Sequence, residues 1–255
     1  MMSKNIFDVL ILLGRPASGK SEIIDYLTHL PAGVRRQRYH IAELDILDDF
    51  PMLWVWFEED DILSRKLGLP RLHNDEHGYF KYKDFWHLLI ERLSLEYHKR
   101  LRDQEYHANK TTLIEFSRGS EHGGYAAAFS HLSDELLQQA AIVYVRVPYE
   151  ESLRKNRRRF NPDRPDSILE HGMSDGKLER LYRDDDFASI AEGDSGWLSI
   201  RGRRVPYVVF PNEDDVTTGK PEQLGVRLES LLESLWDLYQ RAGMQISASD
   251  VETDY

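Results

Sequence analysis

Cysteine is absent from this chain of 255 residues, and no apolar run approaches the roughly 20 residues that a membrane-spanning helix needs. The first absence excludes disulfide bonds and thiolate metal sites. The second excludes a membrane-spanning helix, and the opening residues MMSKNIFDVL contain no signal-peptide cleavage region. We therefore expect a cytoplasmic protein with no membrane partner.

Basic residues are fewer than acidic ones. The chain has 33 Lys and Arg against 44 Asp and Glu, which gives a net charge of −11. A protein that binds long nucleic acids is usually basic, so we do not expect a nucleic-acid partner. The strongest local concentration of positive charge, in residues 154–159, suits a small polyanion such as a nucleotide better than a long duplex.

Residues 14–21 carry the clearest pattern in the sequence. They read GRPASGKS and fit G-x-x-x-x-G-K-[ST], the phosphate-binding loop (P-loop) of nucleotide-binding proteins. The apolar run 9–13 precedes the loop, as expected of a buried strand, and apolar residues return at helical spacing after it. The residues predicted to bind the nucleotide are Gly14, Arg15, Pro16, Ala17, Ser18, Gly19, Lys20 and Ser21.

The residue types of this loop explain the prediction. Gly14 and Gly19 allow a tight turn and a close approach of the backbone to phosphate oxygens. The backbone amides and the positive end of the following helix attract the anion. Lys20 is predicted to contact the β- and γ-phosphates, and the Ser21 hydroxyl to bind Mg²⁺. The alternative is a glycine turn that binds nothing, but every fixed position and the flanking strand and helix agree with the motif.

Apolar segments alternate with helical patterns along the rest of the chain. This alternation indicates an α/β fold with a parallel sheet covered on both faces. We expect a single domain over residues 1–246 and an acidic, disordered tail over 247–255. The five expected strands are 7–13, 39–44, 111–116, 141–147 and 205–210, the last preceded by a turn at Gly202.

The helical patterns leave two segments that need a separate interpretation. Residues 50–110 are too long for a plain crossover and open with Trp54, Trp56 and Phe57, so we interpret them as an inserted acceptor-binding lobe. A helical pair packed on the sheet explains the pattern equally well. Residues 161–176 contain Asp, Pro and Gly and are expected to form a mobile loop. The expected helices are 21–30, 60–67, 81–101, 125–140, 149–159, 177–190 and 221–241.

With the P-loop, five strands and a basic segment after the fourth, the chain resembles the nucleoside and nucleotide kinase branch of P-loop proteins. The resemblance is specific over residues 7–27 and rests on layout elsewhere. It implies a three-layer α/β/α fold with sheet order 2-3-1-4-5. It also implies an acceptor lobe after the second strand, at 50–110, and a lid after the fourth, at 150–190. The cofactors that it implies are ATP and Mg²⁺.

Glu115 and Arg118 lie at the end of the third expected strand. They resemble the acidic–Arg motif of deoxynucleoside and thymidylate kinases, although two residues separate them here and the family pair is adjacent. The resemblance implies that Glu115 holds Mg²⁺ through water and that Arg118 grips the acceptor or the phosphoryl group. The alternative is a purely structural ion pair of Glu115.

Four acidic residues, Glu43, Asp45, Asp48 and Asp49, lie at or just beyond the end of the second expected strand. Ligands of open α/β sheets sit at the carboxyl ends of parallel strands. We predict that Asp45 accepts the proton of an attacking hydroxyl or orients that hydroxyl. The alternative is an acidic loop that only caps the next helix.

The basic segment after the fourth strand resembles the lid helix of nucleotide kinases. Arg154 and Arg158 share a helical face and are predicted to neutralise charge on the transferring phosphoryl group. The alternative is a solvated basic face. The resemblance also implies that residues 211–215, after the fifth strand, lie near the adenine base.

A zinc-peptidase pattern, H-x-x-E-H, occurs at residues 73–77. That chemistry needs the pattern on a helix. Pro70 before it and Gly78 after it argue against a helix, so we expect no zinc.

These observations predict an ATP- and Mg²⁺-dependent phosphotransferase with a small-molecule acceptor, such as a nucleoside or a nucleotide. Sugars and polynucleotide ends remain open as acceptors, and the sequence does not address the oligomeric state. Two alternatives stay in view: a P-loop ATPase that acts as a hydrolytic switch, and a non-catalytic nucleotide sensor. No apolar run ending in paired acids is evident and no N-K-x-D motif is present, which disfavours a motor ATPase and a GTPase.

Overall fold

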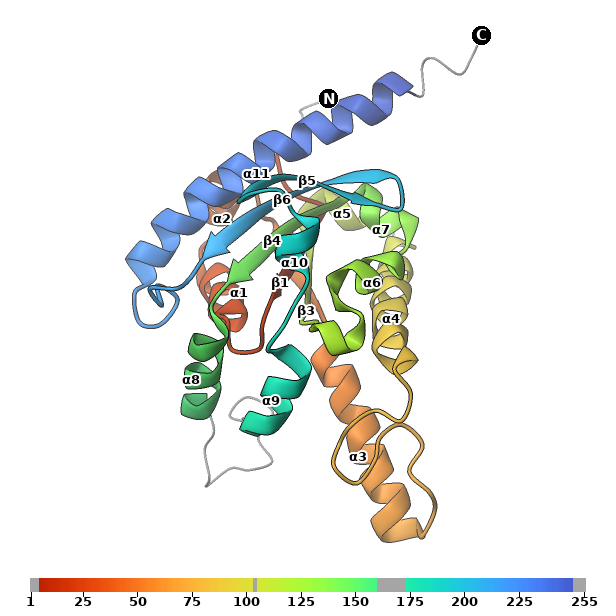
Figure 1. The fold of residues 1–255 in the computed structure, drawn as a ribbon. Helices are drawn as coiled ribbons and strands as arrows, with labels where there is room; N and C mark the ends of the chain where they lie inside the picture. Colours follow the sequence, from red (N-terminus) through yellow and green to blue (C-terminus); the bar gives the residue numbers. More distant parts are fainter. Residues whose placement is uncertain (1–4, 103–104, 160–172, 250–255) are drawn as a thin grey trace.

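The computed structural model of the protein describes residues 5–102, 105–159 and 173–249, and everything below concerns these residues. A six-stranded sheet in the order β2-β3-β1-β4-β6-β5 forms its centre (Figure 1). Neighbouring strands are parallel, except that β5 runs antiparallel to β6. The strands are β1 (Val9–Gly14), β2 (Glu43–Asp48), β3 (Lys110–Phe116), β4 (Ala140–Arg146), β5 (Ser195–Ile200) and β6 (Arg203–Pro211).

The predicted order 2-3-1-4-5 is confirmed for the five parallel strands, where β6 takes the fifth place. The sixth strand, β5, was not predicted. It forms a hairpin with β6 through Arg201 and Gly202, which both have positive φ angles, as a tight two-residue hairpin turn requires. The turn predicted at Gly202 is therefore confirmed.

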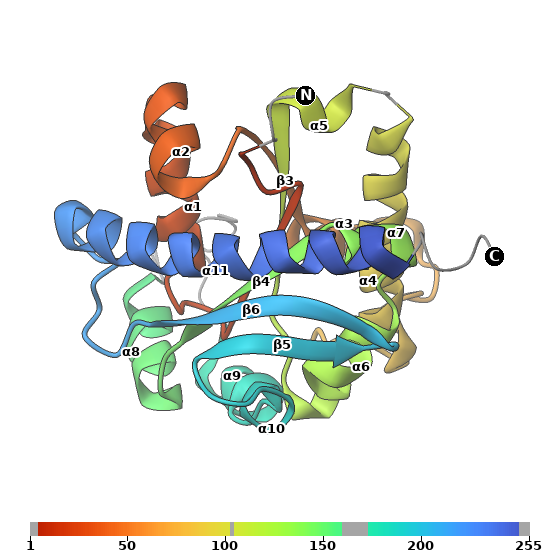
Figure 2. The same cartoon turned by 90° about the horizontal axis from the view of Figure 1, so that it is seen from above.

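The two faces of the sheet carry two separate apolar cores. Successive side chains of a strand point to opposite faces, so Val9, Ile11 and Leu13 enter one core while Leu10 and Leu12 enter the other. The first core is completed by α4, α6 and α7, and the second by α1, α2 and α11. Figure 2 shows α11 running alongside β6. The predicted three-layer α/β/α arrangement is confirmed.

Several of the helices differ from the predicted ones. The patterns at 125–140 and 177–190 each form two helices, and the C-terminal helix continues beyond 241 to Ser249. The last residues of the predicted tail, 250–255, lie outside the described residues. The helices are α1 (Lys20–His29), α2 (Ala32–Tyr39), α3 (Asp49–Leu67), α4 (Asp84–Leu101), α5 (Tyr106–Asn109), η1 (Ser120–His122), α6 (Gly124–Ser130), α7 (Asp134–Gln138), α8 (Tyr149–Arg159), α9 (Asp175–Tyr182), α10 (Phe187–Ile190) and α11 (Pro221–Ser249).

Helix α3 is much longer than the predicted helix 60–67 and starts directly where β2 ends. The Asp48 carboxylate caps it by accepting a hydrogen bond from the backbone amide of Phe50 at 2.9 Å. Its far end terminates at Gly68 in the left-handed conformation. Figure 1 shows α3 and the loop after it extending away from the sheet. This return loop contains residues 73–77, which form a turn rather than a helix.

The second strand was predicted four residues too early. Tyr39 ends α2, and β2 covers Glu43–Asp48. The buried side chains of Tyr39 and Ile41 belong to the core under α2, and they gave the misleading apolar signal. The true strand lies at the edge of the sheet and alternates polar and apolar residues. As a result Asp45 lies within the strand and Asp48 at its carboxyl end.

Among the described residues, no helix combines the length and the apolar content that crossing a membrane requires.

Candidate functional site

The loop between β1 and α1 has the backbone conformation of an anion-binding turn. Ala17 and Gly19 have positive φ angles of 56° and 111°. A Cβ atom at Gly19 would lie 2.6 Å from Oγ1 of Thr217 and 2.7 Å from Nδ2 of Asn212. Glycine at position 19 therefore serves both the turn and its close approach to the loop before α11.

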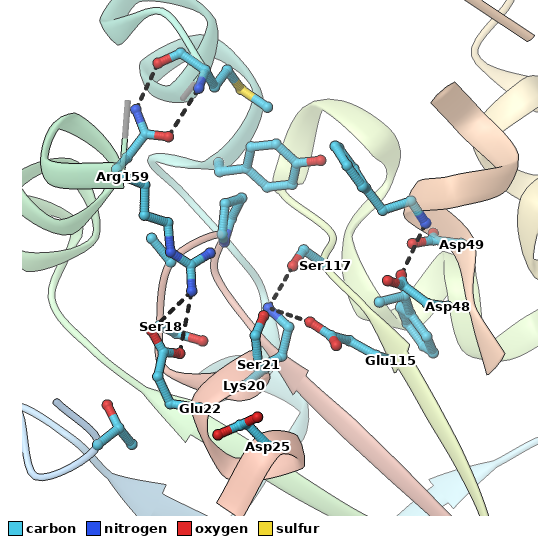
Figure 3. A pocket seen from close by; sticks show the side chains of 18 of the residues that line it. Ser18, Lys20, Ser21, Glu22, Asp25, Asp48, Asp49, Glu115, Ser117 and Arg159 are labelled. Carbon is cyan, nitrogen blue, oxygen red and sulfur yellow. Dashed lines mark hydrogen bonds and ion pairs between the residues drawn. The ribbon is translucent and has the colours of Figure 1, made fainter. Parts of the chain in front are cut away.

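Lys20 is the first residue of α1, and its side chain folds back across the loop. Its Nζ donates hydrogen bonds to the carbonyl oxygens of Gly14 at 3.1 Å and Arg15 at 3.0 Å and to the Ser117 hydroxyl at 2.9 Å. Nζ also lies 3.7 Å from the Glu115 carboxylate (Figure 3). Burial lowers the pKa of Lys20 and raises the pKa of Glu115, because desolvation outweighs their mutual attraction. An anion beside Nζ would stabilise the charged form of Lys20.

Ser18 supplies a further group that an anion could use. It is fully buried, and its hydroxyl has no hydrogen-bond partner among the described residues. The first-turn amides of α1 likewise have no carbonyl partner within the helix, and its amino end carries partial positive charge. The Asn212 side chain fixes this segment by donating to the Ser18 carbonyl at 2.7 Å. The donor set of the loop fits a phosphate group.

The Arg15 side chain, by contrast, points away from these donors. Its guanidinium donates to the carbonyl oxygens of Val147, Tyr182 and Arg183, each at 3.1 Å, and pairs with Asp185 at 3.0 Å. Arg15 was predicted to bind the nucleotide. The structure leaves its backbone in the loop and uses its side chain to fasten the loop to the segment after α9.

A cavity of about 760 Å³ opens over the loop, within the range of about 300–1,000 Å³ usual for ligand pockets. Figure 3 shows that Arg159 and Glu22 lie on one side of Lys20, and Asp48 and Asp49 on the other. We call the second side the α3 end of the cavity. Besides the two Asp residues, its lining comprises Phe50, Pro51, Leu53, Trp86, Arg118 and Tyr182.

Three carboxylates gather on the side of Lys20 that faces the α3 end. Asp48 and Glu115 are register partners on β2 and β3, and Asp49 pairs with Arg118 at 2.7 Å. Burial, together with the negative charges of Glu115 and Asp49, raises the pKa of Asp48 to about 8. Burial also raises the pKa of Asp49, against the attraction of Arg118. A perturbed carboxylate in a cavity is a candidate acid or base.

Asp45 does not lie with these groups. Its carboxylate accepts hydrogen bonds from Arg100 at 2.8 Å and from the Tyr106 hydroxyl at 2.7 Å, and it is not part of the cavity lining. The prediction placed Asp45 beyond the end of the second strand, and the later position of β2 moves it away from the P-loop. Asp48 and Asp49 occupy the place expected for Asp45. If the second strand had been predicted four residues later, the sequence would have indicated Asp48 and Asp49 at its carboxyl end.

We expect Asp45→Asn to lower the free energy of unfolding by about 1 kcal/mol, because it weakens a half-exposed, charge-assisted contact. Nucleotide affinity should not change, since Asp45 lies outside the cavity. Denaturant titration and calorimetry of nucleotide binding check the two parts. Loss of phosphoryl transfer in a stable Asp45→Asn protein would restore the role predicted from the sequence.

The predicted arginines divide between the cavity and its surroundings. Arg118 is 2% exposed and lines the cavity. Arg154 is bonded to Glu151 and Asp215, and Arg158 is exposed; neither lines the cavity. The last arginine of α8 does so instead: Arg159 faces the cavity and pairs with Glu22 on α1 at 3.0 Å. The predicted loop 161–176 lies mostly outside the described residues.

The loop before α11 supports the P-loop from behind. Asn212, besides its bond to Ser18, donates to the Thr217 hydroxyl at 2.9 Å, and Lys155 of α8 pairs with Asp215. Of this loop, Thr217, Gly219 and Lys220 reach the cavity. The lining therefore begins two residues beyond the segment 211–215 that was predicted to lie near the base.

Metal binding by side chains alone is not supported. No group of three or more Asp, Glu or His side chains in the described part of the chain could hold a metal ion. Mg²⁺ is usually bound through one or two carboxylates together with water and substrate phosphates. Ser21 and Glu115 both line the cavity and suit that mode, with Asp48 as a second carboxylate.

We expect Asp48→Asn to raise the stability of the folded protein at alkaline pH. The pKa of Asp48 is raised from 3.8 to about 8 by burial, so the folded protein binds this proton more tightly than the unfolded chain does. The corresponding stability is fully present below about pH 4 and is lost as the pH rises through about 8. Asparagine does not titrate, so the variant should melt above the wild type at pH 9 and close to it at pH 4, as seen by thermal denaturation without Mg²⁺ or nucleotide. A variant that melts below the wild type at alkaline pH would show that ionised Asp48 stabilises the fold.

Comparisons with known proteins are consistent with the fold but weak. No family model matches the chain, and no curated protein matches it. A solved sugar kinase from Janibacter sp. HTCC2649 is 16% identical, with a TM-score of 0.40 over 89% of this chain and 95% of that one. A shikimate kinase from Acinetobacter baumannii, solved with shikimate, is 12% identical, with a TM-score of 0.31 over 99% of this chain and 97% of that one. Scores this low carry no argument about substrate, so the site is interpreted from its own residues.

Proposed function

We propose that this chain is a Mg²⁺-dependent phosphotransferase that moves the γ-phosphoryl group of ATP to a hydroxyl group of a small molecule. The observation that carries the proposal is one continuous cavity, which joins the P-loop with its buried Lys20 to the carboxylates of the α3 end. The P-loop side suits a triphosphate. The α3 end offers a separate compartment with a candidate base, which a phosphotransferase needs for its acceptor.

In this proposal the P-loop binds the phosphate groups of ATP. Lys20, the Ser18 hydroxyl and the first-turn amides of α1 would hold the β- and γ-phosphates. Mg²⁺, when bound, offsets the negative charge of the phosphates; Ser21 and Glu115 would hold it. Arg159 would approach the phosphates from α8, in exchange for its present contact with Glu22.

In this proposal the acceptor binds at the α3 end. One oxygen of Asp48 caps α3, and the other has no hydrogen-bond donor among the described residues. That free oxygen would orient the attacking hydroxyl and accept its proton. Arg118, held by Asp49 at the wall of the cavity, would stabilise charge on the group in transfer. Asp45 has no part in this scheme.

Two other functions use the same loop: hydrolysis of ATP as a switch, and sensing of a nucleotide without chemistry. Neither function needs the compartment at the α3 end. Release of ADP, measured with ATP and Mg²⁺ in the presence and absence of hydroxyl-bearing acceptors, separates the three. A phosphotransferase forms ADP at a rate that depends on the acceptor, together with a phosphorylated product. ADP formation at one rate with every acceptor and with none indicates a hydrolase, and binding without ADP formation indicates a sensor.

A further inference from the structure

The charges at the α3 end of the cavity are already balanced without a ligand. Arg118 is the cationic side chain of this end, and its Nη1 donates to Asp49 at 2.7 Å and to the Ser117 carbonyl at 2.7 Å. Its Nη2 donates to the Trp86 carbonyl at 3.0 Å. The guanidinium therefore faces a carboxylate and two carbonyls, and its remaining nitrogen, Nε, is buried without a hydrogen-bond partner among the described residues. Asp49 therefore pairs with the positive charge of Arg118 before a ligand binds.

None of the other ionisable groups described at this end supplies a positive charge. Asp48 lies beside Asp49, with Glu115 as its register partner on β3. His122 stacks on Trp86 with ring centres 3.9 Å apart, behind the cavity wall. Burial lowers the pKa of His122 to about 2, so this ring does not supply a positive charge near neutral pH. Lys20, the nearest ammonium, is committed to the P-loop.

The walls of the α3 end are largely apolar and aromatic. Phe50 and Leu53 come from α3, Trp86 from α4 and Tyr182 from the end of α9. The Trp86 ring stacks on His122, and the centre of the Arg118 guanidinium lies 5.3 Å from the ring centre. Such a fixed aromatic wall favours a ligand with a flat or apolar body.

We propose, on the basis of the proposed function, that the acceptor is an uncharged hydroxyl compound with a flat or apolar body, and that this end excludes phosphorylated and carboxylated acceptors. An anion placed there would lose its water and meet no unpaired positive charge among the described residues, because the Arg118 guanidinium is paired with Asp49. An uncharged compound with a hydroxyl group can pack against the apolar lining of this end and donate a hydrogen bond from its hydroxyl group to Asp48. The inference thus selects nucleoside-like compounds over nucleotides, and compounds with an aromatic ring over simple sugars.

A two-by-two set of probes tests both parts. Binding of the four ribonucleosides, their 5′-monophosphates, ribose and ribose 5-phosphate is measured by calorimetry with Mg²⁺ and an unreactive ATP analogue present. At least one nucleoside should bind about tenfold more tightly than its own monophosphate and than ribose. Tighter binding of the monophosphates, preference for ribose over every nucleoside, or no binding by any nucleoside overturns the inference.

Two further variants test whether charge at the α3 end excludes anionic acceptors. Asp49→Asn releases the Arg118 guanidinium, so the affinity of a monophosphate relative to its nucleoside should rise about tenfold. At pH 9, above the pKa of about 8 that burial gives Asp48, Asp48→Asn removes a negative charge without touching the Arg118 pair and should shift the ratio in the same direction, even if Asp49→Asn fails to fold. Asp61→Asn, further along α3 and outside the cavity lining, is the matched control and should leave the ratio unchanged. An unchanged ratio in a folded Asp48→Asn protein at pH 9 overturns the charge argument.

Turnover with ATP separates this inference from the proposed function. A nucleoside that binds with the expected selectivity but is not phosphorylated supports the inference on acceptor charge and contradicts the proposed transfer. Phosphorylation of the monophosphates alone supports the transfer and overturns the inference.

Discussion

Lys20→Ala should lower kcat for phosphoryl transfer by about 10²–10³-fold or more, the loss that follows removal of one preorganised charged or polar donor. The Lys20 ammonium is buried between two carbonyls of the loop and the Ser117 hydroxyl, so no other described side chain can take its position. The fold should survive. Burial lowers the pKa of Lys20, which means that its charge costs folding free energy, and Glu115 can take up a proton when its partner is gone.

Steady-state kinetics and thermal denaturation of the same preparation check both statements. Lys66→Ala is the matched control, because Lys66 is exposed at the far end of α3 and does not line the cavity. It should leave kcat and the melting temperature close to those of the wild type. Near-normal transfer by a folded Lys20→Ala protein would remove the P-loop from the mechanism.

Asp48→Asn should lower kcat by about 10²–10⁴-fold, the usual contribution of a positioned general base. The amide preserves the shape of the side chain and can still cap α3, but it cannot accept a proton. ATP affinity, measured by calorimetry with Mg²⁺, should change much less than kcat. A parallel loss of both would assign Asp48 to the metal instead, and an unchanged kcat would reduce it to the cap of α3.

The pH profile of the wild type offers an independent measurement of the same residue. A base acts in its deprotonated form, so kcat/KM should rise with pH and level off above the pKa of Asp48, which burial and two neighbouring carboxylates raise to about 8 in the ligand-free protein. The residual activity of Asp48→Asn should lack this rise. A flat wild-type profile would mean that Asp48 is charged throughout the range.

The parts of the site that could be predicted are those encoded locally. The P-loop needs a strand, two glycines, a lysine and a helix in immediate succession, so its residues were found from the sequence and the structure brings them together. Arg118 also lines the cavity, and its position near the end of a strongly apolar central strand could be read from the sequence. Edge strands carry a weaker signal. The polar alternation of β2 hid its true span, and a shift of four residues exchanged Asp45 for Asp48.

Other features depend on contacts between segments far apart in the sequence. Arg154, Arg158 and Arg159 are equivalent as a pattern, and only the packing of α8 against α1, where Glu22 meets Arg159, distinguishes them. The hairpin strand β5 contains a glycine and two serines, so its sequence resembles a loop, and it is held in place by pairing with β6. The side chain of Arg15 was misplaced for a similar reason, since its partners follow it by more than 130 residues.

The anchoring of Arg15 has a thermodynamic consequence for ligand binding. Three carbonyls and one carboxylate hold its guanidinium, and Asn212 holds the loop from the other side. The loop therefore loses its conformational entropy when the chain folds, and not when a ligand arrives. Binding of even a small anion such as pyrophosphate should then proceed without a slow ordering step, with an association rate that depends on ionic strength rather than on loop closure.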